Sequence, residues 1–594
     1  MAEQTHRPPT TEQGGPAEAP PALADSRPPV GRRRSIVNWL WLAGALLFTA
    51  LFAARTMAPA LAPGTVQDDA RQHVFWMLRF RDPELFRGDL IADYFQWLAP
   101  PAYRALYAAL SWMVDPFLAS KLVSPILGGI TALFTFLLVR RLHPAPTAAF
   151  LGTVLLSWYV WQYDDLASAS PRAFLLPMLA AQVWAIVAGR LVLAVGLTVL
   201  GALFYPTAGA LGVALLAARL VHFRRGSRRG GSRTAPAEQR ADWLAFLVAA
   251  ALVALALLPT VFGATPYGPT VSASEARTMP EFGEGGRNTF FYRDPYRYWL
   301  EGYRGGLDLR VRDQLTGLPI LFEYAALAAL LPMLLLFRPR LADVALLSGR
   351  SRVLLHLLVA SFGLFLLAHL LLFRLYLPSR YVQWSLPLVF AVAAGLALGI
   401  VIEALAERLA PTRPAWLSAG LALALGLGLA LYPASYDGNF VPDRHPEVWA
   451  YLRDLPTDTL VAAVPTEADS VPALTGRRVL VAREYALAYH LGYYGELRQR
   501  TEELIDAYYA DSPRRLVELA ERYGVDVFLV NRAAFDQATY ADAWAGEFAP
   551  FTSAVGDKLR RHDRFALLDL VRRCAAVDDG QVAALPTACI ASAR

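Results

Sequence analysis

The sequence is poor in charged residues. Only 18% of its 594 residues are Asp, Glu, Lys or Arg, and its mean hydropathy is +0.34. Soluble domains carry about a quarter of such residues, so this composition excludes an ordinary soluble enzyme and indicates a multi-pass α-helical membrane protein. The net charge of +6 is then explained by basic cytoplasmic loops. Nucleic acid is excluded as a partner because the sequence has no basic groove or base-stacking motif.

Several chemical motifs are missing as well. The sequence has no internal repeat, no Gly-rich phosphate loop and no Cys/His metal cluster. Ionisable residues within the apolar segments are few, and the plausible cases are His356, His369 and Glu323. A proton- or ion-coupled transporter usually carries more of them. The only cysteines are Cys574 and Cys589. Outside the cell they could form a disulfide worth about 3 kcal/mol, and two free buried thiols are the alternative.

Long apolar runs dominate the rest of the chain. Residues 1–31 are rich in Pro, Gly, Ala and Glu, so we expect residues 1–34 to form a disordered cytoplasmic N-terminus. The next run, Ile36–Ala54, is long enough to be an uncleaved first membrane helix. Ten further candidates bring the expected number of spans in a membrane domain of residues 35–432 to about eleven. They lie near 117–139, 146–162, 171–189, 191–205, 206–223, 242–262, 316–337, 353–374, 381–403 and 415–432.

The arginines between these spans are unevenly distributed. With the N-terminus in the cytoplasm, the basic turns all fall on the cytoplasmic side, as the positive-inside rule requires. These turns contain Arg140-Arg141, Arg190, Arg224 to Arg229, Arg338 to Arg352, and Arg408 with Arg413. The same topology places the first loop (56–116), the long loop (263–315) and everything after Tyr432 outside the cytoplasm. We therefore expect a protein of the plasma (inner) membrane with an extracytoplasmic C-terminus.

The extracytoplasmic segments differ in pattern. In the first loop, apolar residues recur at helical spacing among charges, which predicts helices lying at the membrane interface. The segment 433–594 carries charges throughout. Short strands are expected at Thr459–Val464, Arg478–Ala482 and Gly524–Val530, and a helix at Ser512–Tyr523. Helix, glycine and apolar strand in succession predict a small extracytoplasmic α/β domain with mostly parallel strand pairing.

The first loop contains an acidic pair, Asp68-Asp69. One carboxylate is expected to cap the N-terminus of an amphipathic helix, where acidic residues are favoured. The other would be free to act on a substrate. Both are therefore candidate catalytic residues, and Arg71 and His73 beside them are candidate substrate contacts. Asp69 and His73 are four residues apart and share a helical face, so they could also hold a divalent cation.

Two other external positions suit substrate binding. Asp164-Asp165 follows the third span and could supply a cation or acceptor contact, or could simply end an aromatic belt at the interface. Arg380-Tyr381 begins the tenth span, where the arginine could grip a lipid phosphate with its planar fork or reach toward headgroups. The long loop adds side chains that suit phosphates and sugars, or interfacial anchoring. They are Arg277, Arg287, Arg293, Arg297, Arg304, Tyr292, Tyr296, Tyr298, Trp299 and Tyr303.

Taken together, these residues resemble those of the GT-C superfamily of membrane glycosyltransferases. That group includes protein O-mannosyltransferases, oligosaccharyltransferase catalytic subunits, aminoarabinose transferases and mycobacterial arabinosyltransferases. The resemblance implies that Asp68 or Asp69 contacts the acceptor and acts as the base. It also implies that Asp164-Asp165 matches the second acidic motif and that Arg380-Tyr381 contacts the donor phosphate. The chain departs from many members in that its first two acidic residues are adjacent rather than split by one residue.

The resemblance implies an enzyme of the cell envelope. Such an enzyme would move a sugar from a polyprenyl-phosphate donor, held in membrane lipid, to an extracytoplasmic acceptor. Inversion is the expected outcome because no second carboxylate is evidently placed to form a covalent intermediate. A divalent cation is left open as a cofactor, and its ligands are unknown. The alternatives are a non-catalytic membrane protein of envelope assembly and a lipid or solute transporter.

Overall fold

The computed structural model describes residues 30–221, 236–262, 265–337, 347, 349–464, 467–542, 547–561 and 563–593. The chain forms two units, Met1–Leu40 and Trp41–Arg594, and the second is described here by itself. The disorder expected for the N-terminus falls mainly on residues 1–29, which lie outside the described residues, as do the basic turn at 224–229 and Arg338 and Arg340. Helix α1 (Val30–Met57) begins inside the segment expected to be disordered.

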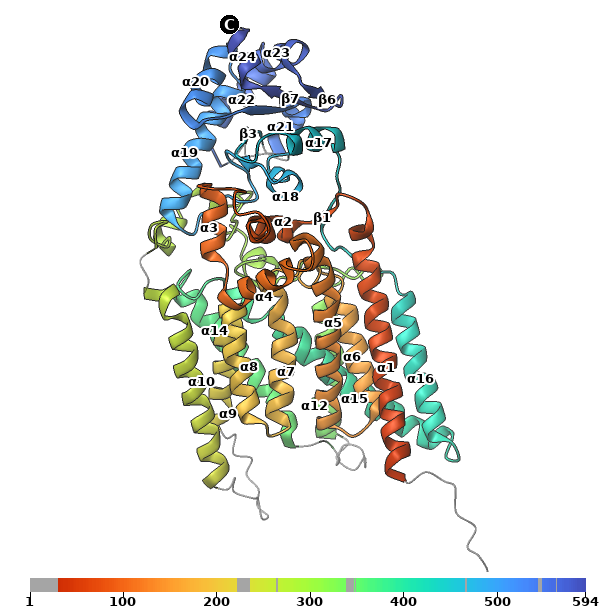
Figure 1. Cartoon of the computed structure of the whole chain (residues 1–594). Helices are drawn as coiled ribbons and strands as arrows, with labels where there is room; N and C mark the ends of the chain where they lie inside the picture. The colour runs from red at the N-terminus through yellow and green to blue at the C-terminus, as the bar shows by residue number, and fades with distance from the viewer. Residues whose placement is uncertain are drawn as a thin grey trace, which may run out of the picture. The chain divides into compact units, whose positions relative to one another are not determined.

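Every expected membrane span coincides with a helix (Figure 1). Besides α1, these are α5 (Pro116–Leu142), α6 (Pro146–Val160), α7 (Leu175–Val187), α8 (Leu191–Phe204), α9 (Pro206–Leu220), α10 (Pro236–Phe262), α12 (Ile320–Phe337), α14 (Arg352–Leu370), α15 (Ser385–Leu409) and α16 (Pro414–Leu431). Within the described residues, six helices are long and apolar enough to cross a membrane, and other apolar helices are shorter. The chain is therefore a multi-pass helical membrane protein, and eleven crossings remain a prediction.

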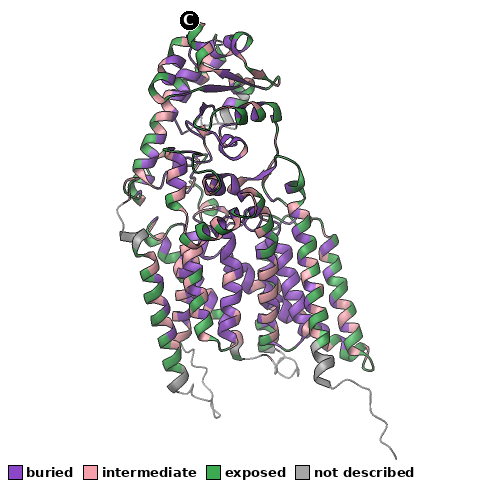
Figure 2. Cartoon of the chain, in the orientation of Figure 1, coloured by how far each residue is buried: buried purple, intermediate pink, exposed green. Residues whose placement is uncertain are grey.

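The centre of the bundle is built around α6 and α15. Residues of α6 from Thr147 to Val160 are all buried, and Figure 2 shows buried helices inside a rim of exposed ones. A Cβ on Gly395 of α15 would lie 2.4 Å from the Cα of Gly152 on α6, so the two helices could not approach so closely with a larger residue there. Because Ala148 faces Gly399 in the same way, the helices run antiparallel. The end of α6 therefore lies beside the start of α15.

The first loop is helical, as its periodicity predicts. It contains α2 (Asp68–Val74), α3 (Leu90–Leu98) and α4 (Pro101–Ser111). Just before α2, strand β1 (Val66–Gln67) pairs antiparallel with β2 (Phe440–Val441). This pairing was not predicted. It ties the residues that precede Asp68 to the segment that follows the last bundle helix.

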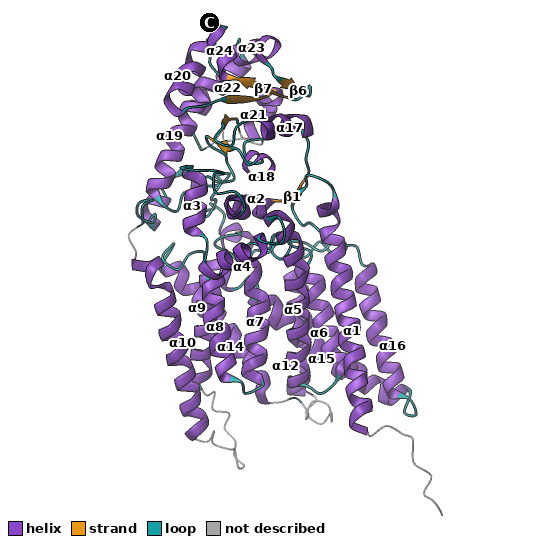
Figure 3. Cartoon of the chain, viewed as in Figure 1, coloured by secondary structure: helices purple, strands orange, loops and turns teal. Residues whose placement is uncertain are grey.

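The segment after α16 contains a five-stranded sheet in the order β4-β3-β5-β7-β6 (Figure 3). The strands are β3 (Leu460–Ala462), β4 (Arg478–Val479), β5 (Val527–Asn531), β6 (Val577–Asp578) and β7 (Val582–Pro586). Strand β3 is parallel to β4 and β5, whereas β7 is antiparallel to β5 and β6. The prediction of mostly parallel pairing is therefore wrong, because two of the four strand pairings are antiparallel. A tight turn at Gly580, with φ of +90°, folds β6 and β7 into a hairpin.

Helices pack around this sheet. They are α17 (Pro446–Asp454), α18 (Val471–Thr475), α19 (Leu491–Tyr508), α20 (Pro513–Tyr523), α21 (Gln537–Asp542), α22 (Phe551–Arg560), α23 (Ala566–Cys574) and α24 (Thr587–Ser592). Cys574 and Cys589 form a disulfide that joins α23 to α24. Of the two alternatives that the sequence left open, the structure therefore has the bridge. The boundary of this α/β region at residue 433 remains a prediction.

Candidate active site

Three carboxylates converge on one arginine. Arg172 contacts Asp69 at 2.7 Å, Asp164 at 3.0 Å and Asp165 at 3.2 Å. Its side chain is buried, so the guanidinium depends on these carboxylates to offset the loss of water. We call these four residues the acidic cluster. The structure thus brings together the two acidic motifs singled out in the sequence, which lie almost a hundred residues apart.

The local fold explains how the second acidic motif reaches this place. Helix α6 ends at Val160, and the chain then turns until Pro171 opens the short helix η3 (Pro171–Phe174). The hydroxyl of Ser168 donates to the carbonyl of Asp165 at 2.8 Å and lies 2.8 Å from the hydroxyl of Ser170. These bonds fold the turn back, so that Arg172 faces the carboxylates that precede it by seven and eight residues.

Arg380 belongs to the same site. It lies in the short helix η7 (Pro378–Tyr381) immediately before α15, and it is buried. Its guanidinium donates to Gln383, and Gln383 and Trp384 each donate to Asp165 at 3.1 Å. Arg380 is thereby linked to the acidic cluster through one shared carboxylate. Tyr381 is placed differently, because its hydroxyl donates to the carbonyl of Leu375 at 2.9 Å.

Tyr303 connects the two arginines. Its hydroxyl accepts a hydrogen bond from Arg172, and its ring lies 4.4 Å from the guanidinium carbon of Arg380. Arg310 approaches the same ring at 4.7 Å. The sequence identified Tyr303 only as one of many aromatic residues in the long loop, and it did not identify Arg172 at all. A signal was present, since Pro171-Arg172 is the first basic position after the second acidic pair.

Asp68 faces away from the acidic cluster. It pairs with Arg71 and accepts a hydrogen bond from Asn439 at 3.1 Å. The expectation that one aspartate of the pair caps α2 is wrong, because Gln67 is the N-cap and its side chain accepts from the backbone of Ala70 at 2.9 Å. Gln67 can do so because the β1–β2 pairing holds it in an extended conformation just before the helix.

Beyond Asp68 lies a second buried group of charges. Arg71 donates to Ser470 at 3.0 Å, and Arg287 of the long loop contacts Glu484 at 2.6 Å. The backbone of Glu484 donates to Asp469 at 2.8 Å. We call Asp68, Arg71, Arg287, Asp469 and Glu484 the junction network, because it joins α2 and the long loop to the region that carries the five-stranded sheet.

Burial changes the protonation of several of these groups. It raises the pKa of Asp69 to about 6, although Arg172 beside it acts in the opposite direction. It also raises the pKa of Glu484 to about 8, against the effect of Arg287. His73 responds in the opposite sense: burial, with Arg172 and Arg287 nearby, lowers its pKa to about 3. Its ring packs edge-on against Phe95 at 5.9 Å. The imidazole is therefore neutral near pH 7, and its predicted role in substrate binding remains a prediction.

The acidic cluster does not fit a divalent cation. Arg172 already occupies the position between Asp69, Asp164 and Asp165 that a cation would need. Across the parts of the chain that the structure describes, no group of three His, Cys, Asp or Glu side chains could hold a metal ion. The charge-balancing role at this site is therefore filled by a guanidinium.

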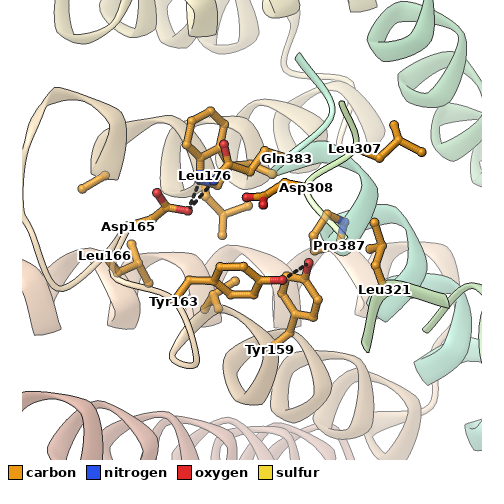
Figure 4. A pocket seen from close by; sticks show the side chains of 13 residues that line it. Tyr159, Tyr163, Asp165, Leu166, Leu176, Leu307, Asp308, Leu321, Gln383 and Pro387 are labelled. Atoms are coloured by element: carbon orange, nitrogen blue, oxygen red, sulfur yellow. Dashed lines mark hydrogen bonds between the residues drawn. The ribbon is translucent and has the colours of Figure 1, made fainter. Parts of the chain in front are cut away.

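A narrow cavity adjoins the cluster on the side of the bundle (Figure 4). Its walls are mainly apolar and aromatic, from the end of α6 and the starts of α12 and α15. The polar groups that reach it are the hydroxyls of Tyr159 and Tyr163, the carboxylates of Asp165 and Asp308, and Gln383. A site that joins buried carboxylates, two arginines and an apolar cavity at the end of a membrane bundle can accept a proton and neutralise a phosphate within reach of lipid.

No description of a known protein family matches the chain, and no curated protein sequence does. Solved structures do match. The apo oligosaccharyltransferase of Archaeoglobus fulgidus is 15% identical with a TM-score of 0.53, covering 87% of this chain and 72% of that one. The oligosaccharyltransferase AglB of Archaeoglobus fulgidus, in complex with an inhibitory peptide and a dolichol-phosphate, is 13% identical with a TM-score of 0.52, covering 86% of this chain and 72% of that one.

A third match is ArnT from Cupriavidus metallidurans bound to undecaprenyl phosphate. It is 11% identical with a TM-score of 0.43, covering 92% of this chain and 97% of that one. At such low identities a match shows the fold alone, and the conclusion about the fold rests on the two oligosaccharyltransferase structures. The chain therefore has a GT-C-like architecture.

Proposed function

We propose that the protein is a glycosyltransferase that moves a sugar from a polyprenyl-phosphate donor to a hydroxyl-bearing acceptor outside the cytoplasm. The observation that carries the proposal is the convergence of Asp69, Asp164 and Asp165 on Arg172, next to Arg380, within a GT-C-like fold. In the solved structures that the chain resembles, a dolichol-phosphate is bound to one oligosaccharyltransferase. The donor and acceptor of this chain are inferred from the chemistry of its own residues.

Asp69 is the proposed base. The acceptor oxygen attacks the anomeric carbon of the sugar, the bond from that carbon to the phosphate oxygen breaks, and the acceptor proton passes to Asp69. A pKa of about 6 suits this role, because the carboxylate is ionised near pH 7 and still binds a proton well. Asp164 and Asp165 are engaged by Arg172, and Asp165 also by Gln383 and Trp384. Asp69 contacts Arg172 as well, so no second carboxylate among the described residues is set apart to form a covalent intermediate, and we propose a single displacement with inversion.

Arg380 is the proposed contact for the donor phosphate. Its guanidinium donates to Gln383 and lies over the rings of Tyr303 and Trp384, and no carboxylate of the described residues forms an ion pair with it, so it can accept an anionic partner. Arg172, by contrast, is already surrounded by carboxylates. As the phosphate leaves, its negative charge would be stabilised by Arg380 in a site from which most water is excluded. The apolar surfaces of the surrounding helices would hold the first part of the lipid.

The proposed reaction requires the acidic cluster to lie outside the cytoplasm. Among the described basic positions, Arg140 lies at the end of α5, Arg190 immediately before α8, and Arg408 at the end of α15. These helix ends are at the end of the bundle opposite the acidic cluster (Figure 1). The positive-inside rule assigns that end to the cytoplasm. A reporter fused after Tyr432 should then be active only outside the cytoplasm, and one inserted in 226–238 only inside. Reversal of either result would contradict the proposed location of the site.

The direct test uses purified full-length protein with a panel of labelled polyprenyl-phosphate sugars and hydroxyl-bearing acceptors. We expect transfer from at least one donor and loss of that transfer in Asp69→Asn. A panel without turnover, from protein that binds polyprenyl phosphate and is folded, would favour a non-catalytic protein of envelope assembly. Movement of labelled lipid across a liposome membrane without transfer would favour a transporter.

A further inference from the structure

Tyr303 of the long loop has four arginines around one side chain. Its hydroxyl accepts a hydrogen bond from Arg172. Its ring lies 4.4 Å from the guanidinium carbon of Arg380, and Arg310 and Arg304 approach the same ring at 4.7 and 5.6 Å. Arg172 belongs to the acidic cluster, whereas Arg380 is the proposed phosphate contact. The hydroxyl and the ring of Tyr303 therefore face different halves of the site.

The backbone on both sides of Tyr303 is held in place. Gly302 precedes it, and a Cβ at this position would lie 2.7 Å from a main-chain oxygen of the preceding turn, so the chain can fold back here only with glycine. On the other side, the main chain of Ser379 donates to the carbonyl of Arg304 at 3.1 Å. Because Ser379 precedes Arg380, this bond joins the neighbours of the tyrosine and of the arginine that its ring contacts.

The hydroxyl of Tyr303 orients Arg172. Nη2 of Arg172 lies 2.7 Å from Asp69 and 3.0 Å from Asp164, and Nη1 donates to the hydroxyl. Since the guanidinium is planar, a bond at Nη1 fixes the direction in which Nη2 points. Burial raises the pKa of Asp69 to about 6, and Arg172 acts against this rise. The orientation of Arg172 therefore sets how basic Asp69 is.

The ring of Tyr303 orients Arg380. This buried guanidinium donates to Gln383 and lies over the rings of Tyr303 and Trp384, at 4.4 and 5.8 Å. The face of an aromatic ring attracts a cation without neutralising it. Arg380 is thus held in one place and keeps its charge for an anionic ligand. A carboxylate in the place of the ring would hold it equally well but would compete with a phosphate.

We propose that Tyr303 is a positioning residue with two separate tasks: its hydroxyl holds Arg172 against the base Asp69, and its ring holds Arg380 for the phosphate of the donor. The inference rests on the proposed function and adds to it a residue of the long loop that acts on both halves of the reaction. Tyr303 is assigned no proton transfer and no contact with the sugar. Because the hydroxyl and the ring can be removed one at a time, the two tasks can be measured separately.

The hydroxyl is tested by Tyr303→Phe, which keeps the ring. Protonation of Asp69 is followed by infrared pH titration of detergent-solubilised full-length protein, and the carboxyl band of Asp69 is the one that Asp69→Asn removes. We expect the midpoint of about 6 to rise by about half a pH unit or more, because Arg172 is no longer held against Asp69. The dissociation constant for a short-chain polyprenyl phosphate should stay within about twofold of that of the wild type.

The ring is tested by Tyr303→Leu, with Tyr303→Met as the second variant if the first does not fold. Both also remove the hydroxyl, so the Asp69 midpoint should rise as in Tyr303→Phe. In addition, the same polyprenyl phosphate should bind about fivefold more weakly, because Arg380 has lost the ring that holds it. The difference in lipid affinity between Tyr303→Phe and the two aliphatic variants isolates the ring.

Tyr324→Phe is the matched control. The hydroxyl of Tyr324 is buried within the bundle and donates to the carbonyl of Leu155 at 2.7 Å. The variant therefore loses a buried tyrosine hydroxyl that is bonded to the main chain. It should change neither the titration of Asp69 nor the affinity for the lipid.

Each task can fail separately. A midpoint in Tyr303→Phe that stays at about 6 or falls would overturn the role of the hydroxyl, because the carboxylates alone would then orient Arg172. Unchanged lipid affinity in the aliphatic variants would overturn the role of the ring. Absence of sugar transfer by the wild type from every donor would overturn the proposed function instead. Neither the titration nor the binding measurement requires transfer, so both would still decide the role of Tyr303.

Discussion

The two aspartates of the first loop are neighbours in sequence, yet they belong to different parts of the molecule. Asp69 turns toward the bundle, where Arg172 joins it to the loop after α6 and, through Asp165, to Arg380. Asp68 turns toward Arg71, Asn439 and the region of the sheet. Adjacent positions on a helix point about 100° apart, so one turn of α2 can serve two networks.

The two networks also differ in whether a cavity adjoins their charged side chains. In the acidic cluster, three carboxylates share one guanidinium, and a cavity opens beside Asp165. In the junction network, Arg71 and Arg287 each have an acidic side chain as partner and further contacts with Ser470 or the backbone of Arg483. The first arrangement can accept a substrate, whereas the second holds structural elements together. Substitutions at the acidic cluster and Arg380 should therefore change turnover or donor binding, whereas substitutions in the junction network should mainly change stability.

The largest effect is expected at Asp69. Asp69→Asn keeps the size of the side chain and removes the base, so turnover should fall by about a hundredfold or more. Asp68→Asn should cost less than about tenfold, because Asp68 contacts Arg71 and Asn439 and not the acidic cluster. Initial rates at saturating donor, with folded protein matched by thermal unfolding, measure both. Equal losses in the two variants would mean that the two sides of α2 act as one site.

The next effect concerns binding of the donor at Arg380. Arg380→Ala removes the charge from a buried position and should weaken binding of polyprenyl phosphate by about 2–4 kcal/mol, a factor of roughly thirty to several hundred. Arg380→Lys keeps the charge without the planar fork and should have a smaller effect. Arg71→Lys, on the other side of α2, is the matched control and should leave donor affinity unchanged. If Arg380→Lys binds as wild type and Arg380→Ala affects only yield, Arg380 anchors the helix and another residue holds the phosphate.

The sequence predicts those helices and site residues that have a local sequence pattern. Apolar runs and periodicity located the bundle helices and α2, and the acidic pairs and Arg380 stand out because charged residues are few in and next to the apolar segments. Arg172 escaped notice because its partners are set by the antiparallel packing of α6 with α15 and by the fold of the turn before η3, neither of which has a local signature. The sequence predicted different roles for Asp68 and Asp69, but the helix cap that it assigned to one of them is wrong. The capping by Gln67 depends on a β1–β2 pairing between residues more than 370 positions apart.

A smaller effect is expected from pH at the acidic cluster. Burial raises the pKa of Asp69 to about 6, and a base works only when it is deprotonated, so turnover should rise with pH through about 6 and level off above 7. At pH 5 the rate should be about a tenth of its plateau value. Asp68→Asn should lower this midpoint slightly, because the negative charge of Asp68 contributes to the raised pKa of Asp69. A midpoint near 4 in the wild type would mean that Asp69 is exposed to water during the reaction and is not held as described.

The smallest effect is expected in the junction network, at Glu484. Its pKa of about 8 means that the carboxyl is mostly protonated at pH 7, so Glu484→Gln replaces one neutral group by another and should change turnover by less than about twofold. The sign of the effect on stability follows from the same value. A carboxyl whose folded pKa lies above its ordinary value of 4.5 destabilises the fold progressively as pH rises from about 4.5 to 8, because ionisation is easier in the unfolded chain.

Glutamine does not ionise, so the melting temperature of Glu484→Gln should rise relative to that of the wild type as pH increases over this range. Arg287→Ala is the informative companion. It removes the partner at 2.6 Å and leaves Glu484 buried alone, so it should lower the melting temperature most above pH 8, where the carboxylate would be charged. Thermal unfolding of both variants at pH 6 and 9 measures this. If Glu484→Gln instead stops turnover at pH 7 with its melting temperature unchanged, the junction network takes part in the reaction, and the contrast between the two sides of α2 does not hold.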